Sequence, residues 1–271
     1  MEYFVGPGLH TVLKAKRPIG FHGLGTRQPT MVLTHVEALD KAIVLPHVLE
    51  VGCGKGYCTL FLADLAQRHV YFHGVDLVEK HVRCADADNS HGARVQFHVG
   101  DAHAWECPGG LKFDLIFGCE SMCHLDPDVF VAHAASMMNP CARLVIIDGF
   151  RGRHWNLCSD LCKDAMRLAE RGFRVNAMPT KAAWKSACDA HGLRLVRDVD
   201  MTEEATPFWA AGCRLASAIM CLPWLVRLYM RSSRARRETV GNLVACAMVA
   251  HALAGGSAEY GMLVFENSQL M

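Results

Sequence analysis

The sequence predicts an α/β fold built on a mainly parallel sheet, and three observations support this prediction. Apolar segments of strand length alternate with amphipathic segments of helix length from about residue 47 to Asp148, as in strands joined by crossover helices. The first apolar segment runs into three glycines at alternate positions, within Glu50–Gly56. The next two apolar segments end in acids, Asp76 and Asp101. Ligands of such sheets bind beyond the carboxyl ends of the strands.

Each element follows from the alternation of apolar and polar residues. The expected strands are 47–51, 70–75, 94–99, 113–117, 142–147, 193–199 and 262–265. The expected helices are 30–42, 55–67, 79–89, 126–138 and 181–191, with more helix within 149–180 and 201–257. Asp126 and Pro127 form an N-cap followed by a proline in the first turn. Asn139-Pro140 is expected to end that helix.

The glycine-rich turn indicates a nucleoside cofactor that carries positive charge. Its pattern is G-x-G-x-G, and Tyr57 stands where a dinucleotide-binding turn would have its third glycine. Glu50 would repel a pyrophosphate but suits an ammonium or a sulfonium. Asp76 at the end of the second strand can accept both ribose hydroxyls, and Asp101 is placed to reach an adenine amino group. An NAD-linked oxidoreductase is disfavoured by Tyr57.

Four segments in this order resemble the class I S-adenosylmethionine-dependent methyltransferases: 50–56, 75–77, 100–102 and 113–117. The resemblance covers roughly residues 45 to 148. It implies a Rossmann-like, mainly parallel seven-stranded sheet with helices on both faces and a helical lid, and S-adenosyl-L-methionine as cofactor. The residues expected to bind the cofactor are Glu50, Gly52, Cys53, Gly54, Gly56, Asp76, Leu77, Asp101, Ala102 and Cys119.

The domain organisation follows from the long insertions around the later strands. We expect an N-terminal cap segment (1–45), the S-adenosylmethionine-binding core (46–148), a lid insertion (149–180), a return to the core (181–200), an apolar helical lid insertion (201–257) and a final core strand (258–271). Within the cap, Tyr3, His10 and His22 are secondary candidates for covering the methionine end of the cofactor. Arg151 and Trp155 are secondary candidates for lining the acceptor pocket.

The loop after the fourth strand holds the expected catalytic residues, Glu120 and His124. The pattern Glu120-x-x-Cys123-His124 resembles the corresponding loop of sterol, tocopherol and other small-molecule methyltransferases. The resemblance implies a small, largely hydrophobic acceptor. One reading is C-methylation of an isoprenoid-like alkene assisted by Glu120, and an alternative is O- or N-methylation with His124 as base. A third, from another class, is a nucleoside-binding partner protein without catalysis.

Composition narrows the remaining function classes. Lys and Arg number 28 against 27 Asp and Glu, so no overall field attracts nucleic acid, and no nucleic-acid partner is expected. The chain has 13 cysteines, and its first residues lack the features of a signal peptide. We therefore expect free thiols in a reducing, cytoplasmic setting. Cys158 and Cys162 near His154 suit one helix face better than a zinc site, and no metal is expected.

The longest charge-free run, Leu215–Val226, leaves three interpretations open. A transmembrane helix needs about 20 apolar residues, and this run is shorter and contains Pro223. It predicts a buried lid helix, an apolar wall of the substrate site, or a helix in peripheral contact with a membrane surface. The arginines between Arg227 and Arg237 form a solvated face, or they bind a phosphorylated substrate or anionic lipid headgroups.

Overall fold

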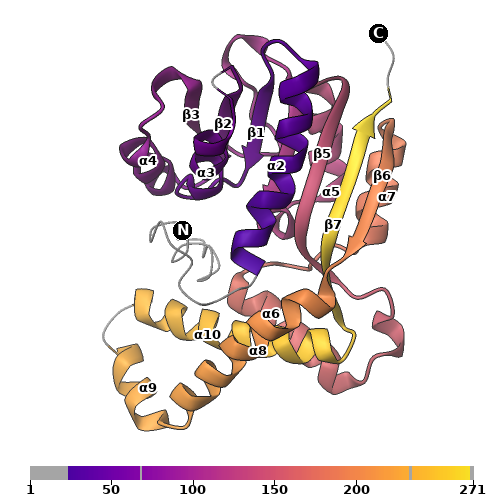
Figure 1. Cartoon of the computed structure of the whole chain (residues 1–271). Helices are drawn as coiled ribbons and strands as arrows, with labels where there is room; N and C mark the ends of the chain where they lie inside the picture. The colour runs from indigo at the N-terminus through magenta and orange to yellow at the C-terminus, as the bar shows by residue number, and fades with distance from the viewer. Residues whose placement is uncertain (1–23, 68, 232–233, 269–271) are drawn as a thin grey trace. The chain divides into compact units, whose positions relative to one another are not determined.

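The computed structural model describes residues 24–67, 69–231 and 234–268. It divides into two compact units. The first consists of the described residues up to Asp148, Ala182–Val199 and the residues from Met262 on. The second consists of Gly149–Lys181 and Asp200–Gly261. Figure 1 shows the elements of both units with the labels used below.

The first unit is built on the sheet. The strands are β1 (His47–Val51), β2 (Tyr71–Asp76), β3 (Val95–Val99), β4 (Phe113–Cys119), β5 (Met138–Arg151), β6 (Leu193–Asp200) and β7 (Ala258–Asn267). Their order is β3-β2-β1-β4-β5-β7-β6, and β1, β2, β3, β4 and β5 pair in parallel. The backbone bonds from Met201 to Tyr260 and from Ser268 to Gly192 join opposite ends of β6 and β7, so β7 runs antiparallel to β6. The predicted seven-stranded, mainly parallel sheet is confirmed.

Helices cover both faces of this sheet (Figure 1). They are α2 (Leu24–Ala42), α3 (Tyr57–Leu65), α4 (Glu79–Asp88), α5 (Pro127–Ser136) and α7 (Lys181–Ala190). On one face α2 packs on α3 and β4. The helices α5 and α7 meet through Phe130 and Trp184, whose ring centroids are 6.1 Å apart. The Asp126 side chain accepts hydrogen bonds from two backbone N–H groups at the start of α5, as the N-cap prediction requires.

The start of β5 differs from the sequence prediction. Asn139-Pro140 does not end the helix but lies inside the strand. The register jumps there, because Phe113 pairs with Met138 whereas Leu115 pairs with Arg143. Four residues of β5 therefore oppose one residue of β4. Pro140 has no N–H for a regular ladder, and a bulge is where a strand tolerates it.

The second unit is helical, with α6 (Asp160–Phe173), α8 (Thr202–Met220), α9 (Pro223–Arg231) and α10 (Arg234–Ala254). Residues 149–180 were expected to be helical, but β5 extends to Arg151 and only α6 is a full helix. Both α6 and α8 pack on α10. A Cβ at Gly172 of α6 would lie 2.5 Å from the Cβ of Ala245 in α10, so this glycine permits the close approach of the two helices.

The charge-free run Leu215–Val226 is not one buried helix, so that interpretation is wrong. It is split between α8 and α9, whose axes are bent by 88°. Pro223 causes the break, because proline disfavours helical geometry in the residue before it and suits the first position of a new helix. Most of its large apolar side chains are exposed, Trp224 at 66%. No single helix among the described residues is long and apolar enough to span a membrane; α8 and α9 reach that length and composition only together.

Candidate functional site

A cavity of about 230 Å³ lies at the carboxyl ends of β1, β2 and β4 and beside the loop that follows β3. The parallel strands bring their last residues to this one edge, at the point where the strand order reverses between β1 and β4. The cavity is lined by most of the residues singled out in the sequence: Glu50, Gly52, Cys53, Gly54, Asp76, Leu77, Asp101, Ala102, Cys119, Glu120 and His124.

The glycine-rich turn is needed for backbone geometry. Gly52 has φ 68°, and a Cβ there would lie 2.4 Å from the Cβ of Ser121. Gly56 is absent from the cavity lining, unlike the other predicted glycines. It has φ 76° at the start of α3, and a Cβ would meet Phe97 at 2.6 Å and Ala85 at 2.9 Å. Gly56 thus serves packing behind the turn, while Gly52 and Gly54 face the cavity.

Asp76 braces the turn and still faces the cavity. Its Oδ2 accepts the Gly54 N–H and its Oδ1 accepts the Val78 N–H, both at 2.8 Å. The Nδ1 of His81 lies 3.4 Å from Oδ1. A carboxylate has about four lone-pair positions, so each oxygen retains capacity for one further donor. This geometry suits the predicted acceptance of two hydroxyl groups.

Glu50 is a buried carboxyl whose surroundings favour its neutral form. It is 3% exposed, and the Thr59 hydroxyl donates to its Oε2. Burial raises the pKa of Glu50 to about 8, although the Thr59 hydrogen bonds lower it; the charge of Asp76 adds to the rise. A cation bound in the cavity would oppose this effect and restore the carboxylate.

Asp101 is the exposed member of the three acids. Its Oδ1 accepts the backbone N–H of His103 at 3.0 Å and lies 2.9 Å from Nδ1 of the same residue. These hydrogen bonds hold the pKa of Asp101 below its usual value. The Nε2 of His103 accepts the Asp126 N–H at 3.1 Å, so its Nδ1 carries the proton and donates to Asp101. Asp101 is therefore a fixed, ionised acceptor at the cavity rim.

Glu120 and His124 line the same cavity from the loop after β4. Glu120 has a left-handed backbone, φ 55°, and its N–H donates to the Ile147 carbonyl at 2.9 Å. The amide of Gln28, from α2, donates to Oε1 of Glu120 at 3.1 Å. Burial lowers the pKa of His124, although the charge of Asp76 opposes this, so the ring is neutral near pH 7.

Several cavity residues were not predicted. Ser121 donates from Oγ to the Val51 carbonyl at 2.6 Å and ties the loop after β4 to β1, and His81 borders Asp76. Ser121 follows the predicted Glu120 directly, so its position along the chain could have indicated it. His81 lines the cavity and Gln28 contacts Glu120. Both lie on helices without a motif, and only the fold brings them here.

The secondary candidates fall elsewhere. Tyr3, His10 and His22 lie outside the described residues. Arg151 and Trp155 belong to the second unit, where the Arg151 guanidinium lies 4.6 Å from the centroid of the Trp155 ring. Arg151 also pairs with buried Glu170 at 2.6 Å.

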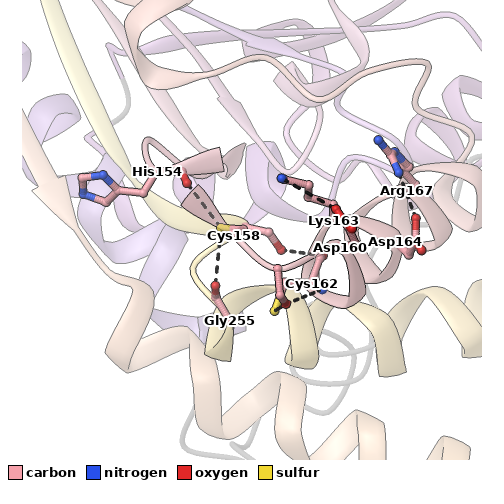
Figure 2. A network of polar contacts seen from close by, with 10 residues as sticks. His154, Cys158, Asp160, Cys162, Lys163, Asp164, Arg167 and Gly255 are labelled. Atoms are coloured by element: carbon pink, nitrogen blue, oxygen red, sulfur yellow. Dashed lines mark hydrogen bonds and ion pairs between the residues drawn. The ribbon is translucent and has the colours of Figure 1, made fainter. Parts of the chain in front are cut away.

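The thiols near His154 contact neighbouring polar groups. Figure 2 shows Cys158 between two carbonyl oxygens, those of His154 and Gly255, at 3.4 and 3.5 Å. The Ser159 hydroxyl donates to Sγ of Cys162 at 3.2 Å. All 13 cysteines are free of disulfides. Across the described residues, no group of three or more His, Cys, Asp or Glu side chains is arranged to hold a metal ion.

A family model described as a methyltransferase domain matches residues 48–141. Residues 48–141 are a methyltransferase domain. The family predicted from the sequence, the class I S-adenosylmethionine-dependent methyltransferases, is confirmed for this part of the chain, which contains the whole cavity edge.

Two curated relatives are O-methyltransferases. The chain is 34% identical over 107 residues to an O-methyltransferase of Penicillium expansum, covering 38% of this chain and 37% of that protein. It is 28% identical over 197 residues to the chloroplastic tocopherol O-methyltransferase of Arabidopsis thaliana, covering 68% of this chain and 54% of that protein. The chain thus spans between about a third and about half of these relatives.

Solved methyltransferase structures share the fold of the domain. One is the geranyl diphosphate C-methyltransferase of Streptomyces coelicolor, in complex with Mg²⁺, geranyl diphosphate and S-adenosyl-L-homocysteine. Its TM-score is 0.61 at 14% identity, over 98% of this chain and 92% of that one. The cofactor expected from the sequence, S-adenosyl-L-methionine, agrees with the demethylated form bound in that neighbour.

Proposed function

We propose that this chain is an S-adenosyl-L-methionine-dependent methyltransferase of a small, largely apolar metabolite, and that the acceptor meets the cofactor beside Glu120 and His124. One observation carries the proposal: these two side chains line one cavity with Glu50, Asp76 and Asp101. Methyl transfer mainly requires that donor and acceptor be aligned and that water be excluded. A single cavity holding both groups of residues meets that requirement.

Each of the three acids is assigned a different part of the cofactor. Asp76 accepts from the ribose hydroxyls with the lone pairs left by the Gly54 and Val78 N–H groups. Asp101, ionised and oriented by His103, accepts from the adenine amino group. Glu50 faces the cationic methionine end, where a nearby positive charge offsets the burial of its carboxylate.

Glu120 is assigned the acceptor side of the reaction. The methyl group leaves the sulfonium sulfur, which keeps the electron pair of the broken bond, and the acceptor supplies the pair for the new bond. An alkene acceptor becomes a carbocation, which a carboxylate stabilises and from which it can remove a proton. Gln28 is then a positioning residue, because its amide holds Oε1 of Glu120.

A second candidate is O- or N-methylation with His124 as general base. It is favoured by the lowered pKa of His124, which leaves the imidazole free to accept a proton at neutral pH. The two curated relatives are also O-methyltransferases. The candidate from another class is a nucleoside-binding protein without catalysis. Release of S-adenosylhomocysteine in the presence of an acceptor would distinguish either methyltransferase from this non-catalytic protein.

The test supplies methyl-labelled S-adenosylmethionine with isoprenoid alkenes, phenols and amines, and identifies the labelled product. We expect Glu120→Gln to slow turnover of an alkene by about 10² to 10⁴-fold, while affinity for S-adenosylhomocysteine changes less than about threefold. Glu79→Gln, at an exposed position on α4 outside the cavity, is the matched control.

Three outcomes would change the assignment. Equal losses of turnover and cofactor affinity in Glu120→Gln would reduce Glu120 to a cofactor contact. Loss of turnover only in His124→Gln, with a phenol or an amine as acceptor, would favour the second candidate. Tight cofactor binding with no labelled product from any acceptor class would favour the non-catalytic protein.

A further inference from the structure

One segment of the second unit carries only positive charge. From Ala205 to Arg237 the sequence contains six arginines and no Asp, Glu or Lys. The whole chain has an excess of only one positive charge, so the remainder carries an excess of acidic residues. Such a segment attracts an anionic surface although the protein as a whole is nearly neutral.

Residues 214–231, which we call the elbow, are also rich in exposed apolar side chains. They span the end of α8, the break and α9. The exposed large apolar residues of the elbow are Leu215, Ile219, Met220, Leu222, Trp224, Leu225, Leu228 and Tyr229. Apolar side chains that cluster on one exposed segment usually mark an interaction site, whereas single exposed apolar residues are common on any protein surface.

The two properties are combined on one side of α9. Trp224, Arg227, Leu228 and Arg231 follow the helical spacing i, i+3, i+4 and i+7, and with Pro223 they line a shallow depression of about 440 Å³. Val226, on the other side of the helix, is buried, so α9 is anchored while its outer side is open. Tryptophan and arginine beside aliphatic residues are typical of helices that lie in a membrane interface.

We propose that the elbow docks the protein on the surface of an anionic lipid bilayer. Trp224 and Leu228 enter the boundary between headgroups and acyl chains, and the guanidinium groups of Arg227 and Arg231 bind lipid phosphates. This surface is separate from the cofactor cavity, whose lining lies entirely within the first unit.

Three other arrangements fit the elbow less well. A transmembrane span would need α8 and α9 in line, and they are bent by 88°. A second copy of the chain bound through the same surface would bring two sets of arginines together, and like charges oppose such symmetric pairing. A nucleic acid would satisfy the arginines but would leave the aliphatic residues without an apolar partner.

The test measures binding of the full chain to vesicles by flotation. We expect binding to phosphatidylcholine vesicles that contain about one third phosphatidylglycerol, little binding to phosphatidylcholine alone, and weaker binding at high salt. Changing both Arg227 and Arg231 to Gln should lower the partition coefficient roughly 30-fold, since each basic residue near such a surface contributes about fivefold. Changing Trp224 and Leu228 to Ala should lower it about tenfold.

Matched controls separate this surface from general charge and apolarity. Arg83→Gln with Arg167→Gln changes the net charge equally at exposed sites outside the elbow. Leu157→Ala with Leu161→Ala removes apolar side chains that are even more exposed, at 85% and 81%. Both control pairs should bind vesicles as the original chain does, and all variants should bind S-adenosylhomocysteine alike.

Four results would overturn the proposal. Equal binding to neutral and anionic vesicles would remove the role of the arginines. Equal losses in the elbow and control pairs would show that no specific surface is involved. Binding of a DNA or RNA oligonucleotide that needs Arg227 and Arg231 but not Trp224, or dimerisation abolished by the elbow substitutions, would assign the surface to that partner instead.

Discussion

The edge of the sheet that forms the cavity and the elbow of the second unit differ in what fixes their structure. At the cavity, the backbone is fixed by nearby residues. Glycines such as Gly52 adopt a left-handed conformation, and acids at strand ends such as Asp76 accept hydrogen bonds from the neighbouring turn. At the elbow, the twelve uncharged residues Leu215–Val226 are compatible with either a buried helix or an exposed bend. What decides is whether another element covers them, and the elbow is mostly uncovered. Local chemistry therefore predicts the first region well and the second poorly.

The largest difference is expected between two tryptophans. Trp184 of α7 is 1% exposed and meets Phe130 edge to face, so Trp184→Ala should lower the free energy of unfolding by about 3–5 kcal/mol. Trp224 of the elbow is 66% exposed, and Trp224→Ala should change it by less than about 0.5 kcal/mol. Urea unfolding of both variants measures these changes in the free energy of unfolding. A loss of more than about 2 kcal/mol in Trp224→Ala would mean that the elbow is covered in solution.

The second prediction compares two acids of the cavity. Asp76 braces the Gly54 turn and faces the ribose, so Asp76→Ala should weaken binding of S-adenosylhomocysteine by about 100-fold or more, roughly 3 kcal/mol. Asp101 is exposed and its carboxylate contacts His103, so Asp101→Ala should weaken binding about tenfold. Titration calorimetry compares the two. Unchanged affinity in Asp76→Ala would show that the ribose does not lie at the end of β2.

The sequence predicted the strands of the core and most of the cavity for a physical reason. Alternation of apolar segments, strand-ending acids and glycines that need positive φ are all local, and parallel strands bring them to one edge. Gly56 followed the same pattern but serves packing against Phe97, which depends on a neighbouring strand. His81 lines the cavity and Gln28 contacts Glu120, and both lie on helices without a motif. The break at Pro223 was visible in the sequence, but the exposure that follows it was not.

The third prediction concerns acid sensitivity of the core sheet. His73 lies between His47 and His98, with nitrogens 3.4 and 3.3 Å apart, and burial, followed by the charges of these two neighbours, lowers its pKa from 6.5 to about 4. Below pH 6.5 the unfolded chain takes up this proton before the folded one does, so stability falls as the pH falls toward 4.

The size of that effect can be measured directly. Between pH 7 and pH 5 His73 alone should remove about 2 kcal/mol from the free energy of unfolding. His73→Gln should lose about this much of the pH dependence when urea unfolding is repeated at both values. A variant that keeps the full slope would assign the acid sensitivity to other groups.

The last prediction compares two glycines of the second unit, one beside open space and one at a tight helix contact. Apart from its chain neighbours and the backbone of its own helix, Gly241 of α10 has no atom within 4 Å of where a Cβ would lie. Gly241→Ala should therefore raise the free energy of unfolding by about 0.5–1 kcal/mol through helix propensity. Gly172 of α6 is its matched opposite, because its Cβ would lie 2.5 Å from the Cβ of Ala245 and 2.7 Å from the Gly241 carbonyl oxygen. Gly172→Ala should therefore destabilise the chain by about 1–3 kcal/mol. Opposite signs in thermal unfolding would show that tight packing in the second unit depends on which side of α10 faces α6, whereas a neutral Gly172→Ala would mean that the α6–α10 contact is loosely packed.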